Sequence, residues 1–330
     1  MEKQIKTKIL VTGGAGYIGS HTCKLLADHG YDPITIDNLV NGHKWAVKWG
    51  ELITGDIQDA ALLDTVFERH QPSAVIHFAG YIDARESLIQ PIMFYQNNVS
   101  CTLSLLSAMH RHNCNKIIFS SSCAIYGIPD KVPITEDMAQ KPISPYGRSK
   151  LMVEQMLQDS EYAYGIKHII LRYFNAAGAD LSGDIGECHD PENHIIPLLL
   201  KTAMGKIPYF KIFGTHYPTK DGTPVRDYIH VTDLAMAHLL ALNDLLNNNQ
   251  SQAYNVGSEQ GHSVNELIEM VRKVTHANLK LKEGQPDPGD PPELVADATK
   301  IKKQLNWAPQ FSDLETLVQS AWQWYVKCNQ

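Results

Sequence analysis

Tyr146 and Lys150 are a pair whose residue types and spacing could do chemistry. Of the 14 tyrosines, only Tyr146 has a lysine four residues later. On a helix, this spacing puts both side chains on one face. A phenol is a poor base near pH 7, but a neighbouring ammonium favours the phenolate. The pair predicts proton transfer by tyrosine, tuned by lysine; the alternative is surface decoration of an amphipathic helix.

Serines precede this pair at the end of an expected strand. The segment 116–120 is rich in β-forming residues and runs into Ser120, Ser121 and Ser122. A side chain at the carboxyl end of a parallel strand lies where open α/β sheets bind ligands. The cluster is therefore predicted to face a ligand.

Gly13, Gly16 and Gly19 form a glycine-rich turn between an expected strand and an expected helix. Glycine lets the backbone approach a pyrophosphate closely at a helix N-terminus, although such a turn can also serve packing alone. Asp37 ends the second expected strand, 18 residues after Gly19. A carboxylate there can bind both ribose hydroxyls of NAD and would repel the 2′-phosphate of NADP, so NAD is the predicted cofactor. Asp56, after the third strand, would suit the adenine ring.

Strand and helix patterns alternate through the first half of the chain. Alternation of this kind is typical of a parallel sheet covered by helices on both faces. The expected strands are 8–12, 32–37, 51–54, 73–78, 116–120 and 167–171, and the expected helices are 21–29, 59–70, 89–112 and 144–161.

The pattern loosens after about residue 175, where loops rich in Gly, Pro and Asp surround shorter elements. Long loops in a compact chain are usually functional. We therefore predict an α/β fold, a doubly wound parallel Rossmann sheet with a smaller mixed α/β substrate-binding lobe. The expected domains are interleaved: 1–175 plus 226–260 bind NAD, and 176–225 plus 261–330 bind the substrate.

Composition excludes several classes of protein. The 330 residues carry 29 Lys and Arg against 36 Asp and Glu, a net charge of −7, which disfavours nucleic acid or an anionic membrane as partner. No apolar stretch is long enough to span a membrane, and no signal peptide is apparent. The six cysteines form no C-x-x-C pair, which indicates free thiols in the cytoplasm. His189 and His194, with Asp190 and Glu192 between them, are interpreted as polar loop residues, and no metal site is predicted.

The combined motifs resemble the UDP-glucose 4-epimerase family of the extended short-chain dehydrogenase/reductase superfamily. The resemblance covers nearly the whole chain and rests on VTGGAGYIGSHT, DNLVNG, GDI, VIHFAG, FSSS, SPYGRSK, LRYFNAAGA, GTPVRDYIHV and YNVG. It implies reversible inversion at C4 of a UDP-hexose through a transient 4-keto sugar, one tightly bound NAD per subunit, and a homodimer. The alternatives are another NAD-dependent enzyme acting on nucleotide sugars, such as a UDP-N-acetylhexosamine or UDP-pentose 4-epimerase, or a non-catalytic NAD-binding regulator.

The resemblance also implies roles for individual residues. Tyr146 would take the proton of the sugar 4-hydroxyl, Ser122 would hydrogen-bond that oxygen, and Lys150 would bind the nicotinamide ribose and tune Tyr146. The implied substrate-binding residues are Ser122, Tyr146, Asn175, His194, Ile195, Arg226 and Asp290. The implied cofactor-binding residues are Gly13, Gly16, Tyr17, Ile18, Gly19, Asp37, Asn38, Asn41, Asp56, Ile57, Phe78, Ala79, Gly80, Asn97, Ser120, Tyr146, Lys150 and Tyr173.

Departures from related patterns refine this expectation. Sugar-nucleotide dehydratases carry acidic residues where Cys123 and Ala124 stand, so elimination chemistry is disfavoured. Ile82 and Asp287 replace cations that the family pattern places near cofactor and diphosphate. Asp287 predicts weaker binding of the UDP-sugar. Leu294 stands where a bulky residue would exclude N-acetylated sugars and a small one would admit them, so both specificities stay open.

Overall fold

The computed structural model describes residues 6–286 and 290–328. Its internal contacts divide the chain into two compact units. Unit 1 comprises the described residues of Met1–Ile125, Pro142–Arg172 and Ala235–Tyr254, and unit 2 comprises those of Tyr126–Lys141, Tyr173–Leu234 and Asn255–Gln330. The predicted NAD and substrate domains remain a prediction, because these units are defined by packing alone.

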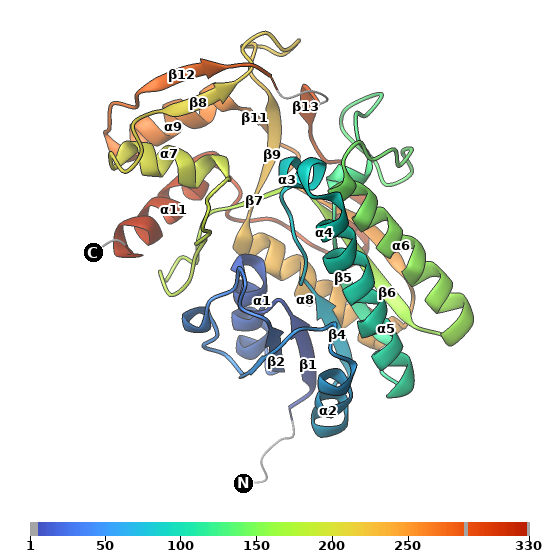
Figure 1. The fold of residues 1–330 in the computed structure, drawn as a ribbon. Helices are drawn as coiled ribbons and strands as arrows, with labels where there is room; N and C mark the ends of the chain where they lie inside the picture. Colours follow the sequence, from blue (N-terminus) through green and yellow to red (C-terminus); the bar gives the residue numbers. More distant parts are fainter. Residues whose placement is uncertain (1–5, 287–289, 329–330) are drawn as a thin grey trace. The chain divides into compact units, whose positions relative to one another are not determined.

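A seven-stranded sheet forms the centre of unit 1 (Figure 1). The strand order is β10-β6-β5-β4-β1-β2-β3, and the pairs β1–β2, β1–β4, β2–β3 and β4–β5 are parallel. The order reverses beside β1, which is the switch point where open α/β sheets bind ligands. The strands are β1 (Lys8–Thr12), β2 (Asp32–Asp37), β3 (Glu51–Thr54), β4 (Ala74–His77), β5 (Lys116–Ser122), β6 (Lys167–Tyr173) and β10 (Gln252–Val256).

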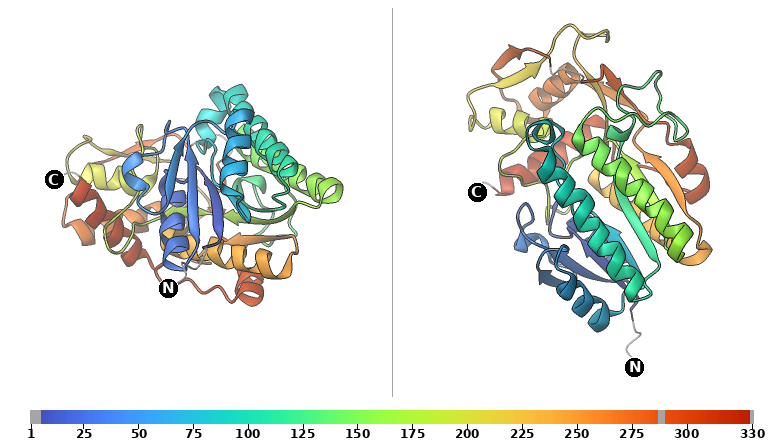
Figure 2. Two further views of the ribbon diagram at one scale, coloured as in Figure 1. Left: turned by 90° about the horizontal axis from the view of Figure 1, so that it is seen from below. Right: turned by 45° about the vertical axis from the view of Figure 1, so that its right-hand side comes forward.

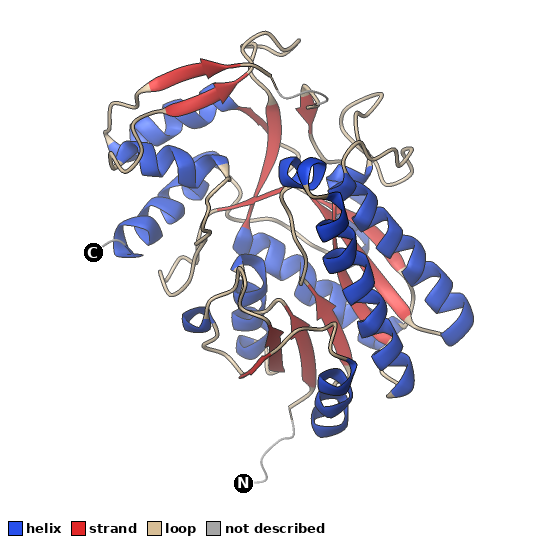
Figure 3. Ribbon diagram, viewed as in Figure 1, coloured by secondary structure: helices blue, strands red, loops and turns tan. Residues whose placement is uncertain are grey.

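Helices enclose this sheet (Figures 2 and 3). One apolar core joins the inner strands to α2 (Ala60–His70), α5 (Cys101–Arg111) and α6 (Pro145–Tyr164). Helices α1 (Tyr17–Asp28) and α8 (Val231–Asn248) follow β1 and β9 in the chain. The near-continuous burial of β1, β4 and β5 is typical of strands covered on both faces.

The predicted helix 89–112 is helical from Pro91 to Arg111, with a π-helical turn that the sequence did not predict. Helix α3 (Ala84–Ile89) ends before Pro91, which begins α4 (Pro91–Tyr95), because proline lacks an amide hydrogen and restricts the residue before it. A π-helical turn (Gln96–Ser100) then joins α4 to α5. Such turns are frequent at functional sites.

Unit 2 contains two small sheets. Strand β9 (Val225–His230) pairs antiparallel with β11 (Gly261–Ser263) and parallel with β13 (Glu293–Leu294) and β7 (Asn175–Ala177). Strand β8 (Phe210–Phe213) pairs with β12 (Leu281–Gly284). The helices are α7 (Ile195–Ala203), α9 (Val264–Thr275), α10 (Thr299–Leu305) and α11 (Leu314–Cys328). A parallel sheet in one unit and mixed sheets in the other confirm the predicted fold class.

Within residues 6–286 and 290–328, no helix combines the length and hydrophobicity needed to cross a membrane.

Candidate active site

The glycine-rich turn lies between β1 and α1. The space around its three glycines differs from one position to the next. Gly13 has a φ of +72°, and a Cβ there would lie 2.7 Å from the Ala79 nitrogen. A Cβ on Gly19 would lie 2.3 Å from the Gly13 oxygen. Both positions therefore need glycine for the fold itself. Gly16 has an ordinary backbone conformation, and a Cβ there would meet nothing closer than 3.3 Å.

The N-terminus of α1 is suited to an anion. Its first turn contains no acidic residue, and no side chain caps it. Backbone amides at a helix N-terminus and the helix dipole attract negative charge. A Cβ at position 16 would be crowded against the Gly13 oxygen, but less than at Gly13 or Gly19, and glycine here also permits the close approach expected of a phosphate. These features fit the pyrophosphate of a dinucleotide.

Asp37 lies beside this turn at the end of β2. Its carboxylate accepts hydrogen bonds from the amides of Ala15, at 3.0 Å, and Leu39, at 2.8 Å. Burial raises the pKa of Asp37, and the two amide hydrogen bonds oppose that rise. Nearby, Asn38 donates to Asp56 at 2.9 Å. The structure thus gathers the predicted ribose and adenine residues at the ends of β2 and β3.

The polar loop after β4 contacts the π-helical turn. Oδ1 of Asn97 accepts a hydrogen bond from the Tyr81 amide at 3.1 Å, and Oδ1 of Asn98 accepts from the same amide at 2.8 Å. Asn98 also donates to Ser149 on α6 at 3.0 Å. Sequence reasoning identified Asn97 and missed Asn98, which joins this loop to the helix that carries Tyr146 and Lys150.

Tyr146 and Lys150 lie in the first turns of α6, on a buried face. Ser144 caps this helix by accepting from the Gly147 amide at 3.1 Å, and Pro145 begins it. A Cβ on Gly147 would lie 2.6 Å from the Ala124 oxygen, so glycine permits the close approach of α6 to the chain that follows β5. Tyr146 is 8% exposed and Lys150 is 4% exposed.

Lys150 is fixed against the end of β5. Its Nζ donates to the Ser120 carbonyl at 2.9 Å and lies 5.9 Å from the centre of the Tyr146 ring. Burial lowers the pKa of Lys150 to about 8, and the Glu154 carboxylate opposes that fall. The lysine is therefore a cation near neutral pH, close to the tyrosine that it is expected to tune.

The serine cluster has three separate sets of contacts. Ser120 contacts Nε2 of His238 at 3.0 Å, and Ser121 donates to Glu154 at 2.5 Å. The Ser122 hydroxyl oxygen accepts from the Ala124 amide at 3.1 Å, which leaves its proton available to donate. Sequence reasoning missed Glu154, although it lies four residues after Lys150 on the same helix.

Ser122 lies in unit 1 with the catalytic pair, whereas the other expected substrate residues and Tyr173 lie in unit 2. Arg226 donates to Asp290 at 2.7 Å, so the structure brings these two residues together. Leu294 is the register neighbour of Arg226 on β13, and Asn175 is the neighbour of Tyr228 on β7. His194 precedes Ile195 at the start of α7. Asp287 lies outside the described residues.

A buried tyrosine and lysine beside a dinucleotide-type glycine turn define the class of nicotinamide-dependent enzymes built on a Rossmann sheet. Residues 9–257 match the NAD dependent epimerase/dehydratase family. The chain belongs to this family, and the resemblance expected from the sequence is confirmed.

Individual relatives agree with the family match. The chain is 50% identical to a UDP-glucose 4-epimerase of Rhizobium meliloti (strain 1021), with 98% of both chains covered. It is similar to the crystal structure of UDP-glucose 4-epimerase from Brucella ovis in complex with NAD, with a TM-score of 0.94, 46% identity, and 96% and 98% of the two chains covered. The Bifidobacterium longum enzyme in complex with NAD⁺ and UDP gives a TM-score of 0.93 at 38% identity, with 97% and 98% covered.

Proposed function

We propose that this chain is a UDP-glucose 4-epimerase, which interconverts UDP-glucose and UDP-galactose with bound NAD. The observation that carries this function is the tyrosine–lysine pair on one buried face of α6, with Lys150 bonded to the end of β5. Near-full-length relatives of 42–50% identity carry the same name.

The residues around the glycine turn fit NAD. Bound NAD would supply the reversible hydride acceptor that oxidation and reduction at C4 require. In our assignment, Gly16 and the first amides of α1 hold the pyrophosphate, and Asp37 binds the adenosine ribose. Asn38 and Asp56 are assigned to the adenine end of the cofactor. The −7 net charge makes these local groups important, because an anionic cofactor gains nothing from the chain as a whole.

Tyr146 is the proposed acid and base. It removes the proton of the 4-hydroxyl as C4 is oxidised and gives it back as C4 is reduced. The Lys150 ammonium stabilises the phenolate form, and the Ser122 hydroxyl hydrogen-bonds the sugar oxygen. Lowering the pKa of a phenol from about 10 to 7 requires about 4 kcal/mol of differential stabilisation, which a partly desolvated cation can supply in part.

Residues of unit 2 are the proposed anchors for the UDP group. Arg226 is the cation assigned to the diphosphate, and Asp290 orients its guanidinium at 2.7 Å. Asn175, His194 and Ile195 are assigned to the same substrate, and Tyr173 to the cofactor. Holding the nucleotide firmly and the hexose loosely allows the keto sugar to turn within the site.

Assembly as a homodimer is part of the proposal. Apolar side chains on α4, α5 and α6 are exposed: Ile92 is 71% exposed, Leu103 57% and Met152 41%. Exposed apolar residues on neighbouring helices are typical of an association surface. A cytoplasmic location is also proposed, because all six cysteines are free.

Replacement of Tyr146 by phenylalanine tests the function. We expect the purified wild-type chain to convert UDP-galactose to UDP-glucose, and Tyr146→Phe to lose at least about 100-fold in turnover, which is the usual contribution of a general acid–base group. NAD released by denaturation and measured by absorbance should be equal in both proteins. Tyr162→Phe, an exposed tyrosine of the same helix, is the control. Retained turnover in Tyr146→Phe would exclude the proposed base.

A further inference from the structure

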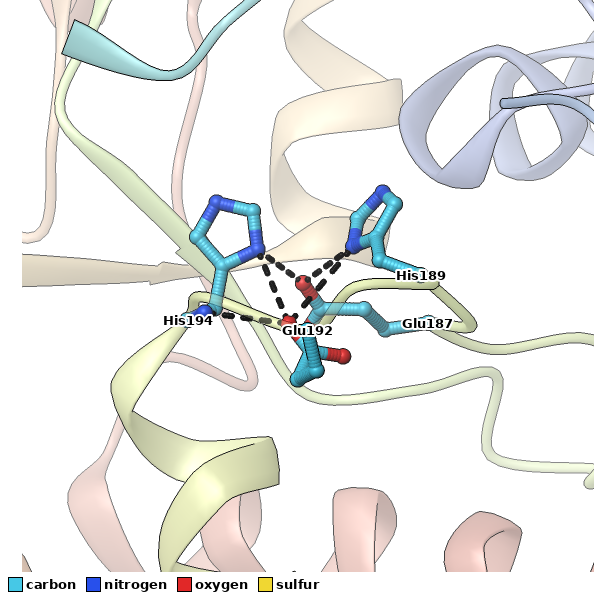
Figure 4. Close-up of side chains that lie close together, drawn as sticks. All are labelled: Glu187, His189, Glu192 and His194. Atoms are coloured by element: carbon cyan, nitrogen blue, oxygen red, sulfur yellow. Dashed lines mark hydrogen bonds and ion pairs between the residues drawn. The ribbon is translucent and has the colours of Figure 1, made fainter. Parts of the chain in front are cut away.

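Four side chains of unit 2 converge ahead of α7 (Figure 4). We call Glu187, His189, Glu192 and His194 the His/Glu cluster. Figure 4 shows both imidazole rings turned toward the two carboxylates. One ligand-type atom from each residue lies within 4.8 Å of every other. The sequence interpretation of these histidines as loop polars omitted Glu187, which the fold brings to them.

The distances within the cluster resemble the edges of a coordination tetrahedron. Bonds of 2.0–2.2 Å place neighbouring ligand atoms roughly 3.3–3.6 Å apart. Oε1 of Glu187 lies 3.2 Å from Nδ1 of His189 and 2.6 Å from Nδ1 of His194. Oε1 of Glu192 lies 3.8 and 3.5 Å from the same two nitrogens. All four atoms lie within 4.8 Å of one another, so a single ion could contact them after the side chains adjust.

Burial makes this arrangement unusual for loop side chains. The side chains of Glu187 and Glu192 are 8% and 3% exposed. Oε1 of Glu187 is buried and lies at ion-pair distance from both imidazoles, but it receives no hydrogen bond of acceptable geometry from either. A buried carboxylate oxygen without such a bond is costly unless a cation compensates it. The oxygen is directed toward the two imidazole nitrogens, where a metal ion would lie.

The surrounding contacts hold the ligands in place. Oε1 of Glu192 accepts the amides of Asn193 and His194, both at 3.0 Å. The Glu187 carbonyl accepts from Nε1 of Trp324 on α11 at 2.9 Å. In metal sites, hydrogen bonds to the metal-binding residues hold those residues in the orientation that binds the ion.

We propose that the His/Glu cluster binds one divalent transition-metal ion, with Zn²⁺ as the preferred ion. Two imidazole nitrogens and two carboxylate oxygens make a closed four-coordinate set, which is typical of a structural zinc site. The ion would join the loop before α7 to the start of that helix. The two proposals share His194, so zinc retention is measured without UDP-sugar and the cluster variants are confined to Glu187 and His189, which keeps the zinc result separate from the turnover result.

Zinc retention tests the site. The intact protein is treated with EDTA, loaded with ZnCl₂, passed over chelating resin and analysed for zinc by mass spectrometry. We expect about one zinc per chain for wild type and for Asp190→Asn, a carboxylate of the same loop outside the cluster, and less than about a tenth of that for Glu187→Gln and His189→Ala. No retained zinc in wild type, or equal zinc in all four proteins, overturns the proposal.

Two further measurements guard against misfolded variants and other ligands. In EDTA the variants and wild type should melt at similar temperatures, and zinc should raise the melting temperature of wild type and Asp190→Asn only. Co²⁺ bound to wild type should give d–d absorption without a thiolate charge-transfer band. Such a band, or loss of zinc in Cys188→Ser, would assign the metal to the neighbouring thiol and overturn the His/Glu ligand set.

Discussion

Glu154 and Arg172 form a doubly hydrogen-bonded ion pair inside unit 1. Nε of Arg172 donates to Oε1 of Glu154 at 3.1 Å and Nη2 donates to Oε2 at 2.7 Å. Their side chains are 1% and 4% exposed. Glu154 also accepts a hydrogen bond from Ser121, so one buried carboxylate links β5, α6 and β6. Glu154 lies one helical turn after Lys150 on α6.

Breaking this pair from one side should destabilise the protein strongly. Glu154→Ala leaves the Arg172 guanidinium buried without its carboxylate, which typically costs about 3–5 kcal/mol. The double variant Glu154→Leu/Arg172→Met removes both charges and should recover most of the loss. Urea unfolding followed by circular dichroism measures both, with the exposed pair Arg272 and Glu269 as a control. A single variant as stable as wild type would contradict the prediction.

The pKa of Lys150 predicts a pH-dependent stability difference. Burial lowers that pKa to about 8 in the folded chain, from 10.5. Between these values the unfolded chain binds more protons, so folded stability rises with pH. Lys150→Met removes the buried cation and should be more stable than wild type at pH 7 while losing turnover. The stability gap should narrow between pH 8 and 10.5. Urea unfolding midpoints of the two proteins, measured without added NAD across this pH range, report the stability difference. A difference that stays constant with pH would show that the lysine is not desolvated.

Two alanine substitutions separate packing from cofactor binding in the glycine turn. Gly19→Ala places a Cβ 2.3 Å from the Gly13 oxygen and should lower stability by about 1–3 kcal/mol, as overpacking does. Gly16→Ala places its Cβ 3.3 Å from the same oxygen, a tight contact that a small shift relieves, so it should lose less stability than Gly19→Ala and bind NAD at least about tenfold more weakly. Thermal unfolding and NAD titration distinguish the effects. Unchanged NAD affinity in Gly16→Ala would remove Gly16 from the phosphate site.

The size of residue 294 should set the choice between plain and N-acetylated sugars. Leu294 lies in register with Arg226, the residue assigned to the diphosphate. Leu294→Ser should raise kcat/KM for UDP-N-acetylgalactosamine relative to UDP-galactose by about 10-fold, and Leu294→Tyr should lower it, because pocket volume discriminates by about 1–3 kcal/mol. The measurement is the ratio of kcat/KM for the two sugars in wild type and in each variant. Equal ratios in all three proteins would place the N-acetyl group elsewhere.

The sequence alone determined the features that depend on neighbours along the chain. The strands 8–12, 32–37 and 51–54 were predicted with the boundaries that the structure has, because hydrophobic runs bounded by turn residues are local signals. The spacing of Tyr146 and Lys150 fixed their common helix face. The glycine turn was also predictable from sequence, because its three glycines lie within seven consecutive residues between a strand and a helix.

Tertiary structure decided which distant residues meet. Arg172 reaches Glu154 because β6 and α6 share one apolar core, and Asp290 reaches Arg226 across 64 positions of sequence. In the His/Glu cluster, the sequence showed that His189 and His194 lie close along the chain. Only the folded loop brings Glu187 to them. Ion pairs and metal sites need side chains to converge in direction as well as in distance. Sequence spacing does not specify that direction once the chain has turned through a loop.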